Sequence, residues 1–251
     1  MSTFEDYLKN VEIRELLEDL GTSEIETLVK EIKHFTEKEA EGRDKILLAY
    51  FGEDGIERIV DSIVQGLFSP PKPRKNAKVL DVGAGSGFFT MKVFEKLRRQ
   101  LPKAAFYAMD LTSAMLLVLA RKTSEITSFL GLADNIKGSI ENAREYLDIP
   151  EKFEALFSTL MLHHCVDVEK VFESFREVVD VNGKAVVIDL CSHSFEEFRE
   201  EMGDVHLGFN PESIKKAAEK HFSKVNTRKI LGIHCNSSGR SAELFMVVMT
   251  P

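Results

Sequence analysis

"VLDVGAGSGFFT", residues 79–90, places three glycines within five positions directly behind an apolar run. Glycine loses more backbone entropy on folding than other residues, so such a cluster indicates either a tight turn or a close approach of the backbone to a ligand. The apolar run predicts a buried strand, and residues 88–101 predict an amphipathic helix. Gly83, Gly85 and Gly87 therefore form a strand-to-helix turn, and three glycines at alternate positions favour a nucleotide-type ligand.

Four further apolar runs alternate with helical patterns along the chain. They are AAFYAMD (104–110), EALFSTL (154–160), KAVVIDL (184–190) and LFMVVMT (244–250). Short buried strands separated by helices are typical of a parallel sheet that is covered on both faces. The sequence therefore predicts an α/β fold, with the glycine turn at the edge of the sheet where such folds bind ligands.

The first 68 residues differ in composition from the rest. They carry apolar residues at helical spacing and are dense in Glu and Lys, whereas residues 69–76 hold three prolines that exclude a helix and mark a linker. We expect residues 1–68 to form a helical cap over the ligand site, with Tyr50 and Phe51 reaching inward, and residues 77–251 to form the ligand-binding domain. The alternative for the N-terminal helices is a dimerisation arm, which would make the protein a homo-oligomer.

Bulk composition narrows the class of partner. The chain has 251 residues and is 43% hydrophobic. Because its net charge is -8, sequence-independent binding to nucleic-acid phosphates is not expected. Its three cysteines form no CxxC pair, which favours reduced thiols. The acidic N-terminus lacks the apolar core of a signal peptide, and no apolar run reaches the length of a membrane span. We therefore expect a cytoplasmic protein that binds neither nucleic acid nor membrane.

Two acidic residues sharpen the prediction for the ligand. The glycine spacing is G-x-G-x-G and not the G-x-G-x-x-G of dinucleotide-binding folds. Asp81, two residues before the first glycine, would repel a pyrophosphate but attract an ammonium or sulfonium group. Asp110 ends the next strand, where it could accept hydrogen bonds from both hydroxyls of a ribose. A nicotinamide-dependent reductase is therefore disfavoured.

These motifs resemble those of the class I S-adenosylmethionine-dependent methyltransferases. Residues 79–90 are similar to the first motif of that family, AMDLTSAML (108–116) to the second, and residues 157–190 to the fourth-strand motif with the helix and strand that follow it. The similarity is nearest to the branch that methylates quinones and other small molecules. It implies a Rossmann-like, seven-stranded, mostly parallel sheet with helices on both faces, S-adenosylmethionine as cofactor, and in-line methyl transfer to a small-molecule acceptor.

The resemblance also implies roles for individual residues. Asp81 would lie near the amino group of the cofactor, Asp110 would hold its ribose, and Leu111 and Met115 would flank its adenine. Ser139 follows a glycine, at a place where the family often has an acid that binds the adenine amino group. In full, the cofactor would be held by Asp81, Gly83, Ala84, Gly85, Gly87, Asp110, Leu111, Met115, Ser139, Ile140, Ser158, Thr159 and Leu160.

The segment after the fourth strand bears on the acceptor. STLMLHH, residues 158–164, lacks the Asn/Asp-Pro-Pro-aromatic run of enzymes that methylate amide or exocyclic amino nitrogens, and this favours a small acceptor. Transfer from a sulfonium needs alignment more than covalent help, and it needs a base only where the acceptor must lose a proton. His163 and His164 are the candidate catalytic bases, although a histidine at this place is more often a structural contact.

Each of the three cysteines has a histidine within two positions. No pair has the ligand spacing of a structural zinc site, so buried thiols without a ligand are the favoured interpretation and no metal site is predicted. A methyltransferase for a thiol or metalloid acceptor that uses these groups is an alternative. We expect each of the three Cys/His groups, including His234–Cys235, to lie just past the end of a parallel strand. We also expect four residues to come within reach of the acceptor pocket: Cys165, Cys191, His193 and His206.

A further class of function is a catalytically silent, S-adenosylmethionine-binding partner subunit that works through its charged N-terminal helices. Turnover of a labelled methyl group would separate an active enzyme from this subunit. Binding of S-adenosylmethionine without binding of a nicotinamide cofactor would separate both from a reductase.

Overall fold

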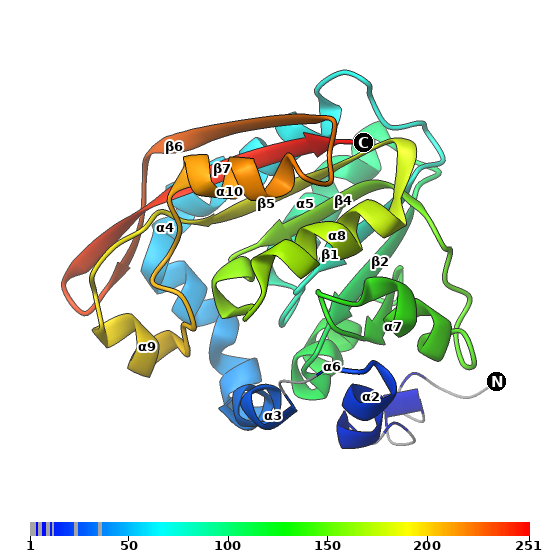
Figure 1. Ribbon diagram of the computed structural model, residues 1–251, viewed down its shortest axis with the longest axis horizontal. Helices are drawn as coiled ribbons and strands as arrows, with labels where there is room; N and C mark the ends of the chain where they lie inside the picture. Colours follow the sequence, from blue (N-terminus) through cyan, green and yellow to red (C-terminus); the bar gives the residue numbers. More distant parts are fainter. Residues whose placement is uncertain (1–3, 5–6, 9–10, 12, 23–24, 35–36) are drawn as a thin grey trace.

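The computed structural model describes residues 4, 7–8, 11, 13–22, 25–34 and 37–251. These residues fold around a seven-stranded sheet with strand order β3-β2-β1-β4-β5-β7-β6 (Figure 1). The strands are β1 (Lys78–Val82), β2 (Ala105–Asp110), β3 (Ile126–Leu130), β4 (Phe153–Thr159), β5 (Val179–Leu190), β6 (Lys224–Ser237) and β7 (Arg240–Thr250). β1 to β5 are parallel, and β7 runs antiparallel between β5 and β6. The expected Rossmann-like, mostly parallel sheet is confirmed.

Helices cover both faces of this sheet. They are α2 (Ile13–Asp19), α3 (Ile25–His34), α4 (Glu37–Phe68), α5 (Phe88–Gln100), α6 (Ser113–Lys122), the short 3₁₀ helix η1 (Leu162–His164), α7 (Ile136–Ala143), α8 (Val168–Val178), α9 (Glu197–Met202) and α10 (Pro211–Ala218). The helices α4 and α5 lie on one face, and α7 and α8 lie on the other (Figure 1). Because neighbouring side chains of a strand point to opposite faces, Val79 packs with α4 and α5, whereas Leu80 packs with α7 and α8. Within the described residues, no helix is long and apolar enough to cross a membrane.

Two strands lie outside the apolar runs that the sequence displays. β3 carries Thr127 and Ser128 among its five residues, and β6 mixes exposed and buried residues because it forms an edge of the sheet. An edge strand with one solvated face need not be apolar throughout. His234–Cys235 therefore lies inside β6 and not beyond the end of a strand, which corrects the expectation for that group.

The long helix α4 belongs to two parts of the molecule. It bends at Gly52, whose φ of 65° and ψ of 169° are not helical. After the bend, Ile59, Ile63 and Leu67 are fully buried in the core that α4 forms with α5 and the sheet, so this half is part of the helical layer. Residues 69–76 then connect α4 to β1 without regular helix or strand.

The described N-terminal residues also pack on the sheet. Tyr7 and Leu16 are at most 2% exposed and belong to the core on the α7 and α8 side. The Tyr7 hydroxyl accepts a hydrogen bond of 3.0 Å from the N–H of Leu130, at the end of β3. Burial raises the pKa of Tyr7 to about 12. The N-terminal segment is thus attached at the carboxyl end of β3.

Candidate active site

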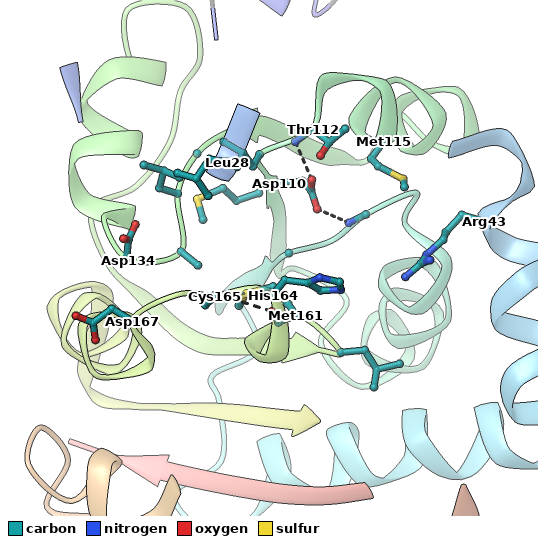
Figure 2. A pocket seen from close by; sticks show the side chains of 18 residues that line it. Leu28, Arg43, Asp110, Thr112, Met115, Asp134, Met161, His164, Cys165 and Asp167 are labelled. Carbon is teal, nitrogen blue, oxygen red and sulfur yellow. Dashed lines mark hydrogen bonds between the residues drawn. The ribbon is translucent and has the colours of Figure 1, made fainter. Parts of the chain in front are cut away.

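A cavity opens at the carboxyl ends of β1, β2, β3 and β4 (Figure 2). In open parallel sheets this edge binds ligands near the point where the strand order reverses, and here β1 lies between β2 and β4. The walls come from the glycine turn, from the segments that follow β2, β3 and β4, and from α3 and α4.

The glycine turn meets the cavity at Gly83 and Gly85. A Cβ atom at Gly85, whose φ is 55°, would meet no atom within 4 Å, so this position opens onto the cavity. Gly87 begins α5 with a φ of 79°, and a Cβ atom there would lie 2.3 Å from Cδ1 of Leu119. Neither Gly87 nor Ala84 lines the cavity. The turn therefore needs glycine for two reasons. At position 85 a side chain would project into the cavity, and at position 87 it would collide with Leu119 of α6.

Asp110, the candidate ribose ligand, lies at the end of β2 and lines the cavity. Its Oδ2 accepts a hydrogen bond of 2.7 Å from the N–H of Gly85, and its Oδ1 accepts one of 2.8 Å from the N–H of Thr112 (Figure 2). Burial raises the pKa of Asp110, although these two hydrogen bonds oppose the rise. Each carboxylate oxygen has a second lone pair that can accept from a ligand. Leu111 and Met115 line the cavity beside it.

Asp81 lies beneath the turn and does not line the cavity. The residue is 2% exposed, and its Oδ2 accepts a hydrogen bond of 2.7 Å from the Thr90 hydroxyl. Its Oδ1 is buried and has no hydrogen-bond partner. Burial raises the pKa of Asp81 to about 7. An unpaired buried carboxylate oxygen is unfavourable, and a cationic ligand group would relieve it.

The expectation for Ser139 and Ile140 is wrong in its geometry. Both residues are buried in α7, and neither lines the cavity. The Ser139 hydroxyl donates a hydrogen bond of 2.7 Å to the carbonyl of Asn135 and accepts one of 3.0 Å from the N–H of Leu132. These bonds hold the loop between β3 and α7, so the side chain has a structural role.

The segment directly after β3 lines the cavity instead. It supplies Gly131, Leu132, Ala133 and Asp134. β3 is not recognisable in the sequence as an apolar run. The resemblance therefore aligns the family's adenine-site glycine with Gly138, whereas the glycine that lines the cavity is Gly131. Leu132 follows this glycine, so no acid stands directly after it. Asp134 is the acidic residue of this wall, and burial raises its pKa.

The exit of β4 contributes Leu160 and Met161 to the cavity, whereas Ser158 and Thr159 are buried within the strand and do not line it. Leu160 has a φ of 57°, which is rare for a residue with a bulky side chain. Its N–H donates a hydrogen bond of 2.8 Å to the carbonyl of Ile188, and this bond holds the strained conformation. Strain of this kind is concentrated at functional sites.

The two candidate bases have different surroundings. His164 lines the cavity, whereas His163 is 3% exposed and faces two buried carboxylates. Its Nδ1 lies 2.6 Å from Oδ1 of Asp189, and its Nε2 lies 3.5 Å from Oδ1 of Asp204. Burial lowers the pKa of His163, but the carboxylates outweigh that effect and raise it overall. Burial also raises the pKa of Asp204 to about 6, against the opposing charge of His163.

The segment that carries Asp204 is fastened to the exit of β4. The N–H groups of Val205 and His206 donate hydrogen bonds of 3.1 and 2.9 Å to the carbonyl of His163. Residues 207–209 then pair with the end of β5, and α10 begins at Pro211 as its Asn210 cap predicts. The segment thus crosses the carboxyl edge of the sheet.

The cysteines do not form a common site. Cys165 lines the cavity with its Sγ 3.0 Å from Sδ of Met161, whereas Cys191, His193 and His206 do not line it. Among the described residues, no group of three close metal-ligating side chains includes a cysteine. The structure therefore brings only the first of the three groups to the cavity.

Two lining residues come from the N-terminal helices and have no recognisable sequence signal. Leu28 of α3 and Arg43 of α4 line the cavity, and burial lowers the pKa of Arg43 (Figure 2). Tyr50 and Phe51, the residues expected there, do not line it. Phe51 packs instead against Phe89, with ring centroids 6.3 Å apart. A charged helix pattern ordinarily marks a solvated face, so the inward position of Arg43 is a tertiary effect.

Residues 73–229 match the family model described as "Methyltransferase domain". The match covers more than half of the chain, and the chain belongs to this family of methyltransferases. The resemblance to class I S-adenosylmethionine-dependent methyltransferases, with S-adenosylmethionine as cofactor, is thereby confirmed.

Among curated proteins, the chain is similar to the ubiquinone/menaquinone biosynthesis C-methyltransferase UbiE of Sinorhizobium fredii. The two are 24% identical over 171 residues, which cover 68% of this chain and 61% of the relative. A highly reducing polyketide synthase of a Fusarium species is 25% identical over 150 residues, which cover 56% of this chain and 6% of the synthase. The chain thus spans less than two thirds of the length of these relatives.

Among solved structures, the fold is similar to phosphoethanolamine N-methyltransferase 2 of Haemonchus contortus in complex with S-adenosyl-L-methionine. The TM-score is 0.61 at 15% identity, over 96% of this chain and 60% of that one. Geranyl diphosphate C-methyltransferase of Streptomyces coelicolor has a TM-score of 0.58 at 11% identity, over 79% of this chain and 81% of that one. At these identities the likeness concerns the fold.

The residues at the cavity fit the family's cofactor. Gly85 leaves open space at the wall, and Asp110 keeps acceptor capacity for two hydroxyls. Asp81 does not line the cavity, but its buried Oδ1 below the turn has no hydrogen-bond partner.

Proposed function

We propose that the protein transfers the methyl group of S-adenosylmethionine to a small-molecule acceptor by in-line displacement in the cavity of Figure 2. S-adenosylmethionine supplies a methyl group that is already activated as a sulfonium. One observation carries the proposal: a single cavity joins the glycine turn and Asp110 to walls formed by Arg43 and His164. The chain then has to align the acceptor and exclude water, which is the main demand of this chemistry.

The cofactor roles follow from the positions described above. Asp110 binds the ribose hydroxyls, and Asp81 attracts the amino group from below the turn. Leu111 and Met115 flank the adenine. The segment after β3, residues 131–134, takes the role that the family resemblance implies for Ser139, because it lines the cavity and α7 does not.

The acceptor occupies the side of the cavity formed by Leu28, Arg43, Leu160 and His164. Two leucines suit an apolar ring or chain, and the half-buried guanidinium of Arg43 favours an oxygen that carries negative charge. The UbiE relatives, whose name refers to ubiquinone and menaquinone biosynthesis, support a quinone-like ring. We therefore propose a hydroxylated ring as the acceptor class.

The N-terminal cap is part of the proposal, with its boundary at the bend of α4. A chain that starts at Glu53 keeps the buried half of α4, and we expect it to fold and to bind the cofactor more weakly than the full chain. A chain that starts at Ser69 lacks that half, and we expect it to unfold because a face of the sheet is uncovered. Full-strength binding by the Glu53 chain would refute the cap. If binding is unchanged while self-association is lost, the N-terminal helices are a dimerisation arm.

Calorimetry and a methyl-transfer assay test the proposed function. We expect the full chain to bind one S-adenosylmethionine and no nicotinamide cofactor, and to move a labelled methyl group onto a hydroxylated quinone analogue. Absence of S-adenosylmethionine binding would refute the proposal. Binding without transfer to any of a panel of hydroxylated rings would favour the silent partner subunit.

A further inference from the structure

Beside the cavity, three side chains bring metal-ligating atoms together. One ligand atom each from His163, His164 and Asp204 lies within 4.8 Å of the other two. The histidines belong to η1, at the exit of β4, and Asp204 belongs to the segment fastened to the His163 carbonyl. We propose that these three residues bind a divalent first-row transition ion.

The distance between His163 and Asp204 is the first argument. Nε2 of His163 and Oδ1 of Asp204 are 3.5 Å apart. A hydrogen bond between a charged nitrogen and a carboxylate is shorter, about 2.7–2.9 Å. Two ligand atoms of a tetrahedral ion with bonds of about 2.0–2.1 Å lie about 3.4 Å apart. The spacing of the pair is therefore that of two ligands sharing an ion.

The second argument is the state of the Asp204 carboxylate. The residue is 4% exposed, and both of its oxygens are buried without a hydrogen-bond partner. Buried carboxylates ordinarily accept several hydrogen bonds or bind a metal, whereas Asp204 has only the more distant charge of His163 at 3.5 Å. An ion between Asp204 and the histidines would satisfy this carboxylate.

The third argument is the residue that orients His163. Its Nδ1 lies 2.6 Å from Oδ1 of Asp189, which also accepts a hydrogen bond of 2.7 Å from the N–H of Leu190. The carboxylate thus fixes the ring so that Nε2 faces Asp204. A carboxylate bound to the far nitrogen of a ligating histidine is the usual support of such ligands.

The ligand set indicates the class of ion and its use. Imidazoles suit zinc, iron, nickel and copper, and two histidines with one carboxylate leave coordination positions open. Since His164 also lines the cavity, an open position can face the acceptor. There the ion would bind an acceptor oxygen and lower the pKa of its hydroxyl, in place of a general base. This use rests on the proposed function, whereas binding of the ion does not.

Zinc binding by the full chain tests the site. The protein is stripped with a chelator, dialysed against zinc and assayed for bound metal, and cobalt is substituted to record its ligand-field absorption. We expect one zinc per chain in the wild type and in the control His221→Gln, which alters a histidine outside the site. Asp204→Asn and His164→Gln should each weaken binding at least about tenfold and abolish the cobalt bands.

Two results would overturn the site: no zinc retained by the wild type, or equal retention in both variants. In either case His163 and Asp204 form an ordinary ion pair. Circular dichroism checks that the variants fold, and His164→Gln, which alters a side chain at the cavity wall, decides the matter if Asp204→Asn does not fold. The zinc measurement needs neither cofactor nor acceptor. S-adenosylmethionine affinity is measured separately on the same samples. Failure of the proposed function can therefore be distinguished from failure of the metal site.

Discussion

The two sides of the cavity are built in different ways. On the proposed cofactor side, the glycine turn and Asp110 come from neighbouring strands, and the N–H of Gly85 donates a hydrogen bond of 2.7 Å to the Asp110 carboxylate. On the proposed acceptor side, Arg43 and His164 line the cavity from distant parts of the chain, and the buried Asp204 lies behind His163. The proposed cofactor side is thus built from a local sequence motif, whereas the proposed acceptor side is assembled from segments that are far apart in the sequence.

The largest effect on the cofactor side is expected from Asp110→Ala. The variant removes a charged acceptor from the ribose and from two backbone N–H groups, and hydrogen bonds to charged groups contribute about 1.5–3 kcal/mol. We expect the dissociation constant for S-adenosylmethionine to rise roughly 10- to 100-fold by calorimetry. Asp148→Ala, at an exposed acid outside the cavity, should leave it unchanged. An unchanged constant in folded Asp110→Ala would remove the ribose assignment.

A pair of glycine variants separates ligand contact from packing within the same turn. Gly87→Ala places a Cβ atom against buried Leu119, so we expect a stability loss of roughly 2–4 kcal/mol in urea unfolding. Gly85→Ala meets no protein atom, so it should lose only about 1 kcal/mol from its left-handed backbone. Among folded molecules, however, Gly85→Ala should weaken cofactor binding more than Gly87→Ala does. The reverse order of affinities would contradict the division of roles.

The smallest expected effect is the pH dependence that Asp81 confers. Its pKa of about 7 in the folded protein lies above the ordinary 3.8, so the folded chain binds the proton more tightly than the unfolded chain. The contribution of neutral Asp81 to stability is therefore present at low pH and is lost as the pH rises from about 4 to about 7.

Cofactor binding should show the opposite trend, because only ionised Asp81 attracts an ammonium group. We expect affinity for S-adenosylmethionine to rise with pH by up to about tenfold per unit below about pH 7, and then to level off. Asp81→Asn should give a flat profile with lower affinity at high pH. A wild-type profile as flat as that of Asp81→Asn would show that Asp81 does not act on the cofactor.

The contrast between the two sides also explains what could be predicted from the sequence. Asp110 and Met115, which the sequence singles out, both line the cavity, because strand, turn and helix signals lie within a short stretch there. Ser139 was misplaced because β3 contains polar residues and so has no clear strand signal. The positions of Arg43 and Asp204 follow from packing between segments far apart in the chain, for which hydrophobic periodicity gives no information.

The most direct test of the central claim is a crystal structure of the full chain with S-adenosylhomocysteine. We expect the product to occupy the cavity of Figure 2, with its ribose hydroxyls hydrogen-bonded to Asp110 and its sulfur directed toward Leu160 and Met161. A product bound outside this cavity, or one whose ribose is held by Asp134, would contradict the account.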